Sequence, residues 1–439
     1  MVHEFKNGIF DTNKNPSPQA LQSVAAMCFK VISPLAFRNR AFDASAFVSF
    51  TMCLARLRGD TKLFELALSS YPIALRCFRS YINMVVLDRS KMSIHIDVLM
   101  AISIALQFFE WLADGGPAGK GYRGHISGAL DLLKMSGPRV MQTSVSRYLF
   151  TGIRHSVLWV ALSERKATFL AKDAWITLPY QLSIKSAGEV LLDFLLRIPG
   201  LLDRADNITR LSSEEVRAEA GKGEDQSHEA VTFCHISKFF RDCDELVQEA
   251  DSWMENLEKS EVGPLWWYSK TNYAAAETSL PLECKSCISL SNGKINFARP
   301  NIASLLITYW GGMLELFSAI VEVRDLLYNS HMDTVPPLDS IYSSMSMPKD
   351  RPTKYALRIY QTAMYLSSGL EGCTIAYGSL LVAAKHFGKQ HENAELNCNG
   401  ISLVESKEQD VNSLGIACCK QALGILLNTM HCGNPAASS

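Results

Sequence analysis

The sharpest grouping of reactive residue types in the sequence is the CxxC motif of Cys284 and Cys287. Two thiolates at this spacing can occupy adjacent corners of a zinc tetrahedron, but a closed site needs two more ligands. The nearest candidates are Cys234, His235 and Cys243, and no second CxxC motif exists. A redox pair of the thioredoxin type would need a βαβ context, which is absent. Cys284 and Cys287 are therefore weak metal candidates, and ordinary cysteines are the preferred interpretation.

Two further patterns match functional motifs only in part. The glycine-rich segment 114–121 contains a lysine, but that lysine lacks the preceding glycine and the following serine or threonine of a phosphate-binding loop. His386 and His391 do not have the spacing of a zinc protease helix, and no glutamate follows His386. We therefore expect an inter-helix connection at 114–121 and surface histidines near a helix end. The sequence predicts no catalytic residue and no cofactor.

Four aromatic residues could line a pocket for a small molecule. Trp266 and Trp267 follow a proline, and Tyr309 and Trp310 are adjacent in an apolar segment. A largely apolar pocket could bind and shape a small molecule without acid–base residues. The simpler interpretation is that these side chains pack between helices.

The elements expected to position these residues are almost all helical. Apolar residues recur at steps of three and four over 62–81 and 144–170, and segment 97–112 has the pattern of a buried helix. Further helices are predicted at 186–198, 239–257, 301–327, 354–370, 374–388 and 412–430. The stretch 289–297 contains Asn292-Gly293 and predicts a small hairpin or a simple turn. The expected fold class is all-α, a large array of stacked antiparallel helices with few or no strands.

A polar segment divides this array into two halves. Residues 204–230 contain glycine and lack aromatic residues, which is typical of a linker or loop. The predicted organisation is a mobile segment at 1–19, a helical half at 20–203, a linker or loop at 204–230, a second helical half at 231–432 and a tail at 433–439.

The composition excludes a broad attraction to nucleic acid. The chain has 43 Lys and Arg against 44 Asp and Glu, a net charge of -1, and no run of four basic residues. Its 12 cysteines are scattered among apolar neighbours, and its N-terminus lacks the apolar core of a signal peptide. The apolar run Val98–Phe109 is shorter than the roughly 20 residues that span a bilayer. These observations predict a soluble, reduced, intracellular protein with no membrane partner.

The stretch HISGALDLLKMSGP at 125–138 has the residue pattern of a helix that ends at Gly137 and Pro138. We expect His125 to begin this helix as a capping or interhelical hydrogen-bonding residue. Gly128 lies inside the helix, where it costs about 1 kcal/mol relative to alanine, and this predicts a close helix approach.

Segment 125–180 resembles the fungal-specific transcription factor domain, which lies C-terminal to binuclear zinc cluster DNA-binding modules. The resemblance rests on the order and spacing of His125, Gly128, Ala129, Gly137, Pro138, Phe150, Arg154, Arg165, Phe169, Trp175, Pro179 and Tyr180. Segments 54–82, 301–316 and 356–388 resemble the early and closing helices of the same domain. Ser136 departs from the family, which more often has arginine there.

The resemblance implies a regulatory domain without its usual zinc cluster, because the first cysteine is Cys28 and no basic arm precedes it. It predicts a nuclear regulator of a fungal gene set, such as one for secondary metabolites. Such a regulator would act through the transcription machinery or another DNA-binding regulator, without contacting DNA itself. The acidic face at 242–258 would suit such partners or would simply be solvated. The alternative is a biosynthetic enzyme or small-molecule-binding protein of the cytoplasm, built on the same scaffold.

Overall fold

The computed structural model describes residues 39–87, 92–114, 119–219, 226–269, 294–329, 351–367 and 370–397, with 415, 417–420 and 422–424. The helices of its N-terminal part are α3 (Arg40–Arg58), α4 (Thr61–Leu87), α5 (Met92–Asp114), α6 (Lys120–Ser136), α7 (Ser144–Glu164), α8 (Asp173–Thr177) and α9 (Ala187–Leu195). Those of its C-terminal part are α10 (Ile198–Glu219), α11 (Gln226–Ser260), α14 (Pro300–Asn329), α16 (Arg351–Leu366) and α17 (Leu370–Asn397). Short 3-10 turns lie at Pro138–Gln142, Phe169–Ala171 and Leu178–Tyr180. Helices make up most of the described chain, and this confirms the predicted all-α class.

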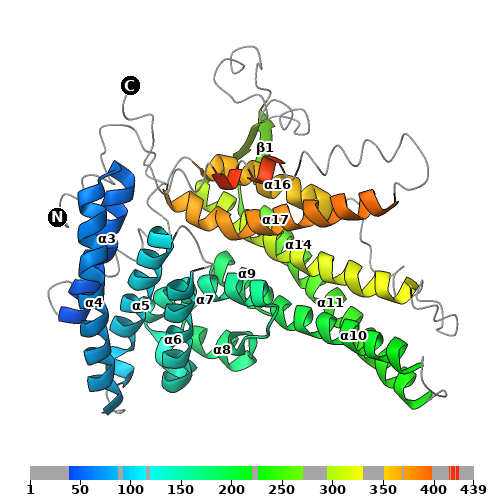
Figure 1. Ribbon diagram of the computed structural model, residues 1–439, viewed down its shortest axis with the longest axis horizontal. Coiled ribbons are helices and arrows are strands. Elements are labelled where there is room, and N and C mark those ends of the chain that lie inside the picture. Colours follow the sequence, from blue (N-terminus) through cyan, green and yellow to red (C-terminus); the bar gives the residue numbers. More distant parts are fainter. Residues whose placement is uncertain are drawn as a thin grey trace.

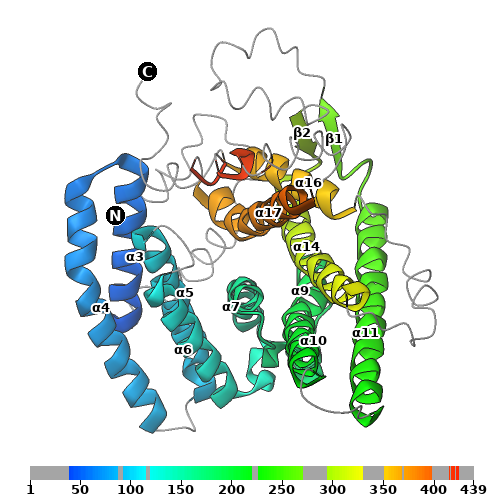
Figure 2. The ribbon, with the colours of Figure 1, turned by 45° about the vertical axis from the view of Figure 1, so that its right-hand side comes forward.

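Helices α3 to α6 stand side by side at one end of the molecule (Figure 1). Asn39 caps α3 by accepting from the backbone N–H groups of Ala41 and Phe42, and Gly59 ends the helix at φ 63°. That left-handed conformation favours glycine and lets the chain reverse directly into α4. Helix α4 packs mainly on α3 and forms the outer edge of this group (Figure 2).

The C-terminal helices form the other end of the molecule. Helix α14 packs against α10, α16 and α17, and α11 runs beside α9 and α10 (Figure 2). The only sheet among the described residues pairs β1 (Trp266–Ser269) with β2 (Lys294–Phe297) in antiparallel register, with Trp266 opposite Phe297. The strand at 294–297 pairs with 266–269. The hairpin or simple turn predicted at 289–297 depends on Asn292-Gly293, which lie outside the described residues, so it stays a prediction.

The predicted linker or loop at 204–230 is largely helical in the described residues. Helix α10 continues to Glu219 and α11 begins at Gln226. Leu201, Ala205 and Ile208 supply a buried stripe at steps of three and four along α10, so one apolar face is sufficient to hold a helix whose other face is polar. The predicted segments 1–19 and 433–439 lie outside the described residues.

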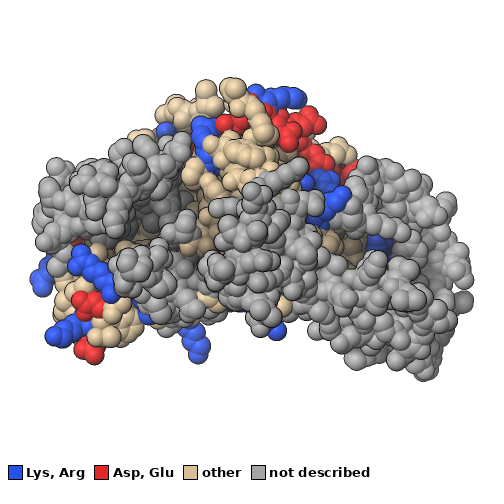
Figure 3. Space-filling model, turned by 90° about the horizontal axis from the view of Figure 1, so that it is seen from above, with Lys and Arg blue, Asp and Glu red and all other residues tan. Residues whose placement is uncertain are grey.

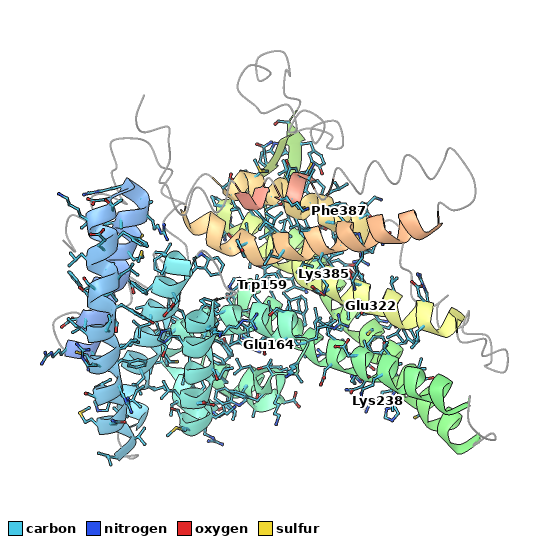
Figure 4. The ribbon with its side chains drawn as sticks, in the orientation of Figure 1. Trp159, Glu164, Lys238, Glu322, Lys385 and Phe387 are labelled. Atoms are coloured by element: carbon cyan, nitrogen blue, oxygen red, sulfur yellow. The ribbon has the colours of Figure 1, made fainter. Side chains whose placement is uncertain are left out.

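The indole of Trp159 on α7 joins the N-terminal helices to the C-terminal ones. A Cβ atom at Gly378 on α17 would lie 2.6 Å from the indole Cδ2, and one at Gly311 on α14 would lie 2.8 Å from its Cη2. Real Cβ atoms do not approach other atoms so closely, so glycine at both positions makes room for the ring. Figure 4 labels Trp159 where α7 lies near α17.

Two segments are long and apolar enough to cross a membrane by length and composition, His95–Ala113 and Pro300–Leu326. Most of each segment is buried inside the protein, at 67% and 78% of the apolar window. Packing against neighbouring helices therefore accounts for their apolar character. The run Val98–Phe109 is part of the first segment, so the expectation that this region is too short for a bilayer does not hold.

The described cysteines are mostly buried thiols rather than reactive ones. Cys53, Cys77, Cys234, Cys243 and Cys419 are free. Burial raises the pKa of the Cys53 thiol to about 12, and that of Cys419 to about 12. Cys418 forms a disulfide bond, so the expectation that all cysteines are reduced does not hold for this residue.

Candidate functional site

The first cluster of polar side chains joins α4, α5 and α6 around Tyr71, Glu110 and His125. The phenol of Tyr71 hydrogen-bonds the carboxylate of Glu110, and its oxygen lies 2.8 Å from Nε2 of His125. A carboxylate can only accept, so the phenol donates its single proton to Glu110 and accepts from Nε2–H of His125. The prediction of an interhelical hydrogen-bonding histidine is confirmed.

Other expectations for this stretch are wrong. Helix α6 begins at Lys120, not at His125, because Tyr122 packs edge-on against Trp111 at 5.6 Å and extends the helix upstream. A carboxylate does lie beside the histidine, with Glu110 Oε1 at 3.9 Å from Nε2. The side chains of His125 and Glu110 are only 13% and 14% exposed. The phenol of Tyr71 lies between them and so joins α4 to α5 and α6.

The close helix approach occurs at Gly121 rather than at Gly128. A Cβ atom at Gly121 would lie 2.2 Å from the carboxyl carbon of Glu110, whereas one at Gly128 would have nothing within 4 Å. Gly128 is exposed. The prediction for Gly128 fails because a glycine in a helix does not by itself reveal which face it occupies.

These two glycines on one helix should respond oppositely to alanine. Gly128→Ala is expected to raise the free energy of unfolding by about 0.5–1 kcal/mol, because it removes backbone freedom from the unfolded chain at an open position. Gly121→Ala is expected to lower it, because Glu110 must leave its hydrogen-bonded position. Urea unfolding followed by circular dichroism measures both, and equal effects of the two variants would contradict the assignment.

Burial keeps three histidines neutral in the folded protein. It lowers the pKa of His125, His155 and His386 to about 4 each, with the charge of Lys389 adding to the effect at His386. His386 is 7% exposed, so the expectation of a surface histidine is wrong there. In the unfolded chain these histidines bind protons near pH 6.5, whereas in the folded chain they stay neutral at that pH.

Stability should therefore fall as the pH is lowered from 7 to 5. The expected slope is at most about 1.4 kcal/mol per pH unit for each of these histidines, since the unfolded state binds the additional proton. His125→Gln retains a side-chain donor but cannot titrate, so its unfolding free energy should depend less on pH than that of the wild type. Denaturant titrations at pH 7, 6 and 5 compare the slopes. Identical slopes would show that His125 is not neutralised by folding.

The second cluster lies between α7, α9 and the segment that links them, around the fully buried Arg154. Its Nη2 lies 2.5 Å from Oδ1 of Asp193, and its Nη1 lies 3.3 Å from the phenol of Tyr180. The Nζ of Lys185 lies 2.5 Å from the other oxygen of Asp193. Arg154 also lies over the ring of Phe150 at 5.5 Å. One carboxylate is thus shared by two cations in the interior.

Aromatic residues of the resemblance complete this cluster. Trp175 packs edge-on against Phe169 at 5.1 Å and lies 5.9 Å from Phe150. Pro179 is buried beside Tyr180 in a 3-10 turn. Gly137 ends α6 at φ 76°, where glycine is favoured, and Pro138 opens the next turn, as predicted. Residues dispersed over 150–180 therefore meet in one packed unit.

Arg165 connects this unit to the C-terminal helices. It ends α7 in a left-handed conformation, at φ 51°. Its guanidinium lies 2.7 Å from Asp206 on α10 and 2.9 Å from Glu322 on α14. Burial alone would raise the pKa of Glu322, but the hydrogen bond from Lys389 and the charge of Arg165 hold it below its usual value. Figure 4 labels Glu322 in this region.

The four candidate pocket aromatics do not form a single group. Tyr309 is buried and stacks on Trp253 at 5.3 Å. Trp267 is 45% exposed on the sheet. Trp266 and Trp310 share one neighbour, Arg358, whose guanidinium lies 4.7 Å and 5.6 Å from their ring centroids.

Three carboxylates of the acidic face of α11 pair with arginines elsewhere in the chain, whereas Glu245, Glu255 and Glu258 are exposed. Asp242 pairs with Arg204 at 2.6 Å, Glu249 pairs with Arg197, and Asp251 pairs with Arg351. Arg204 lies on α10, Arg351 begins α16, and Arg197 lies in the turn between α9 and α10, so these carboxylates help to hold α11 in place.

The described residues contain no group of three or more His, Cys, Asp or Glu side chains that could hold a metal ion. Cys284 and Cys287 lie outside the described residues, as does part of segment 114–121. The weak metal prediction for the CxxC motif therefore stays a prediction.

Asp193, Lys185 and Glu322 are the residues that sequence reasoning missed. Each is a common charged residue without a motif of its own, and Glu322 is distant in sequence from the cation that it binds. Asp193 alone leaves a signal, since it is a charge inside the apolar run of α9.

No family model, no curated protein and no solved structure matches this chain.

Proposed function

We propose that this chain is a helical regulator that acts through protein partners and controls a fungal gene set, such as one for a secondary metabolite. In this proposal it works in the nucleus and does not contact DNA itself. The proposal rests on the resemblance of segments 54–82, 125–180, 301–316 and 356–388 to the fungal-specific transcription factor domain.

The observation that supports it best is the way in which the residues of the resemblance are used. His125 connects three helices, Arg154 and Trp175 anchor a buried cluster, and Arg165 connects that cluster to α10 and α14. All four act as structural residues, as expected of residues that mark a shared scaffold rather than a reaction centre.

The surface charge is consistent with protein partners. Acidic and basic side chains of the described residues lie next to each other in small groups on the face shown in Figure 3. Together with a net charge of -1, this mixed pattern gives no long-range attraction to nucleic acid and suits contacts of limited size with other proteins.

The enzyme alternative gains no specific support from the described residues. The buried histidines have pKa values lowered to about 4, and the buried thiols of Cys53 and Cys419 have pKa values raised to about 12. Groups shifted in these directions are poor bases and poor nucleophiles at pH 7.

Deletion of the gene, followed by transcript and metabolite profiling, tests the proposal. A regulator lowers or raises a group of transcripts, whereas an enzyme leaves the transcripts unchanged and one intermediate accumulates. A fluorescent fusion of the full chain should concentrate in the nucleus. Unchanged transcripts together with a cytoplasmic fusion would overturn the proposal.

A further inference from the structure

Arg358 on α16 is a partly buried cation to which no described residue supplies a counter-charge. Its guanidinium lies 4.7 Å from the ring centroid of Trp266 on β1 and 5.6 Å from that of Trp310 on α14. Figure 2 shows the two strands beside α16 and α14. Every other partly buried arginine in the described part of the chain donates to a carboxylate or to a carbonyl oxygen. Arg358 is the exception, since it has aromatic neighbours but no hydrogen bond and no ion pair with a described residue.

The donors of Arg358 remain accessible between these rings. A guanidinium is planar and carries its five N–H groups in that plane, so contact with aromatic rings leaves donors available. The nitrogen Nε of Arg154 is buried without a partner, whereas no nitrogen of Arg358 is buried in this way. Arg358 therefore combines a partly desolvated charge with N–H groups that a small anion can reach. Such a charge attracts an anion more strongly than a fully hydrated one does.

Gln361 supplies a second donor in the same region. It lies three residues after Arg358, on the same face of α16, and its Oε1 accepts from the phenol of Tyr268 at 3.0 Å. Its amide N–H groups have no partner among the residues that the structure describes. Tyr268 and Trp266 alternate with Trp267 along β1 and so lie on one side of the strand, with their ring centroids 5.5 Å apart. Strand β1 and helix α16 thus bring a cation and a neutral donor together beside two aromatic rings.

The charges of α16 favour an anion at this position. The helix carries Arg351, Lys354 and Arg358, and no Asp or Glu occurs from Arg351 to Leu366. Arg351 already pairs with Asp251. The local excess of positive charge is therefore not cancelled on the helix itself.

We infer that Arg358 binds the carboxylate of a small aromatic acid. One guanidinium and one amide match the two oxygens and the single negative charge of a carboxylate. A phosphate group carries a charge of about −1.5 to −2 at pH 7 and would require a second free cation, whereas Arg351 is already paired. Trp266 and Tyr268 are partly exposed, so the aromatic body of the acid can pack against them. This inference goes beyond the proposed function, because such binding does not depend on a role in transcription.

Fluorine NMR with the purified full chain tests the inference. The probe is 4-fluorobenzoate, and its neutral twin is 4-fluorobenzamide. The benzoate resonance should broaden and shift as protein is added, and the benzamide resonance should not. Arg358→Gln should weaken binding of the benzoate about tenfold or more, because it removes a charged hydrogen-bond donor. Arg358→Lys should weaken it as well, since an ammonium lacks the planar fork that meets both oxygens.

The matched control is Arg241→Gln, which removes one positive charge from an exposed position on α11. It should leave the affinity for 4-fluorobenzoate unchanged. Circular dichroism verifies that each variant is folded. Saturating 4-fluorobenzoate should raise the thermal midpoint of the wild type and of the control, but not that of Arg358→Gln.

The competing role for Arg358 is to join β1 to α16 through its aromatic contacts alone. In that case Arg358→Gln lowers the thermal midpoint, the wild type does not bind 4-fluorobenzoate, and the inference is overturned. It is equally overturned if 4-fluorobenzamide binds as well as the acid, if Arg241→Gln weakens binding as much as Arg358→Gln, or if inorganic phosphate displaces the benzoate at equal concentration.

Glu277 and Glu283 are the acidic residues of the sequence between β1 and β2. If 4-fluorobenzoate binds only to the variant Glu277→Gln/Glu283→Gln, carboxylates of the chain itself compete for Arg358, and the inference of an external acid fails. Equal affinity of this variant and the wild type supports the inference.

Discussion

Asp193→Leu is expected to lower the free energy of unfolding by about 3–5 kcal/mol, because it leaves the guanidinium of Arg154 buried without a counter-charge. Arg154 has no exposed side-chain surface, and Asp193 is its only anionic partner within 4 Å among the described residues. Tyr180, the other polar contact, offers a neutral oxygen. Guanidinium chloride unfolding of the wild type and the variant measures the difference.

A double-mutant cycle separates the ion pair from simple packing. Arg154→Met should cost less than Asp193→Leu, because Lys185 remains on Asp193 after the arginine is removed. The double variant Arg154→Met/Asp193→Leu should be more stable than Asp193→Leu alone, since it buries no charge without a partner. Additive losses in the cycle would mean that the two side chains act independently, contrary to the contact described.

Gly378→Ala is expected to destabilise the protein by about 1–3 kcal/mol through overpacking. The new methyl group would lie within 3 Å of three atoms of the Trp159 indole. The same rigid ring lies against Gly311, so it can move away only by disturbing that second contact. Thermal unfolding followed by circular dichroism measures the loss.

Gly388→Ala on the same helix is the matched control. A Cβ atom there would have nothing within 4 Å, so this variant should be neutral or slightly more stable. Adding Trp159→Leu should reduce the cost of Gly378→Ala, because the smaller side chain removes the overlap. If Gly378→Ala and Gly388→Ala behave alike, the indole does not occupy the gap between α7 and α17.

The sequence predicts the fold class well because helical periodicity is a local signal. The apolar steps within α4 and α7 and the stop at Gly137-Pro138 depend on neighbours within a turn or two. The end of α10 shows where composition misleads. Its polar residues resemble a linker, yet Leu201, Ala205 and Ile208 are sufficient to hold one face of the helix. A few buried contacts outweigh the average polarity of a segment.

The candidate site is predictable only in its marker residues. Arg154 and Trp175 can be found from a pattern, but their partners cannot, since the choice of Asp193 depends on how α7 and α9 cross. Gly121 and Gly128 of α6 make the same point. Both are conformationally equivalent in the sequence, and only the position of Glu110 on α5 decides that Gly121 is the one that must stay small.

The contact of Trp159 with Gly311 and Gly378 has a kinetic consequence. The hairpin of α3 and α4 and that of α16 and α17 join residues close in sequence, so each can form quickly. Trp159 is separated in sequence from Gly311 and Gly378 by much of the C-terminal part of the chain. Closing so long a loop costs conformational entropy before the contacts that it brings together can stabilise the fold. We therefore expect this contact to form late in folding. A substitution at Trp159 should therefore change the unfolding rate more than the folding rate. The contact of Trp159 sets the lifetime of the folded state more than the rate at which it forms.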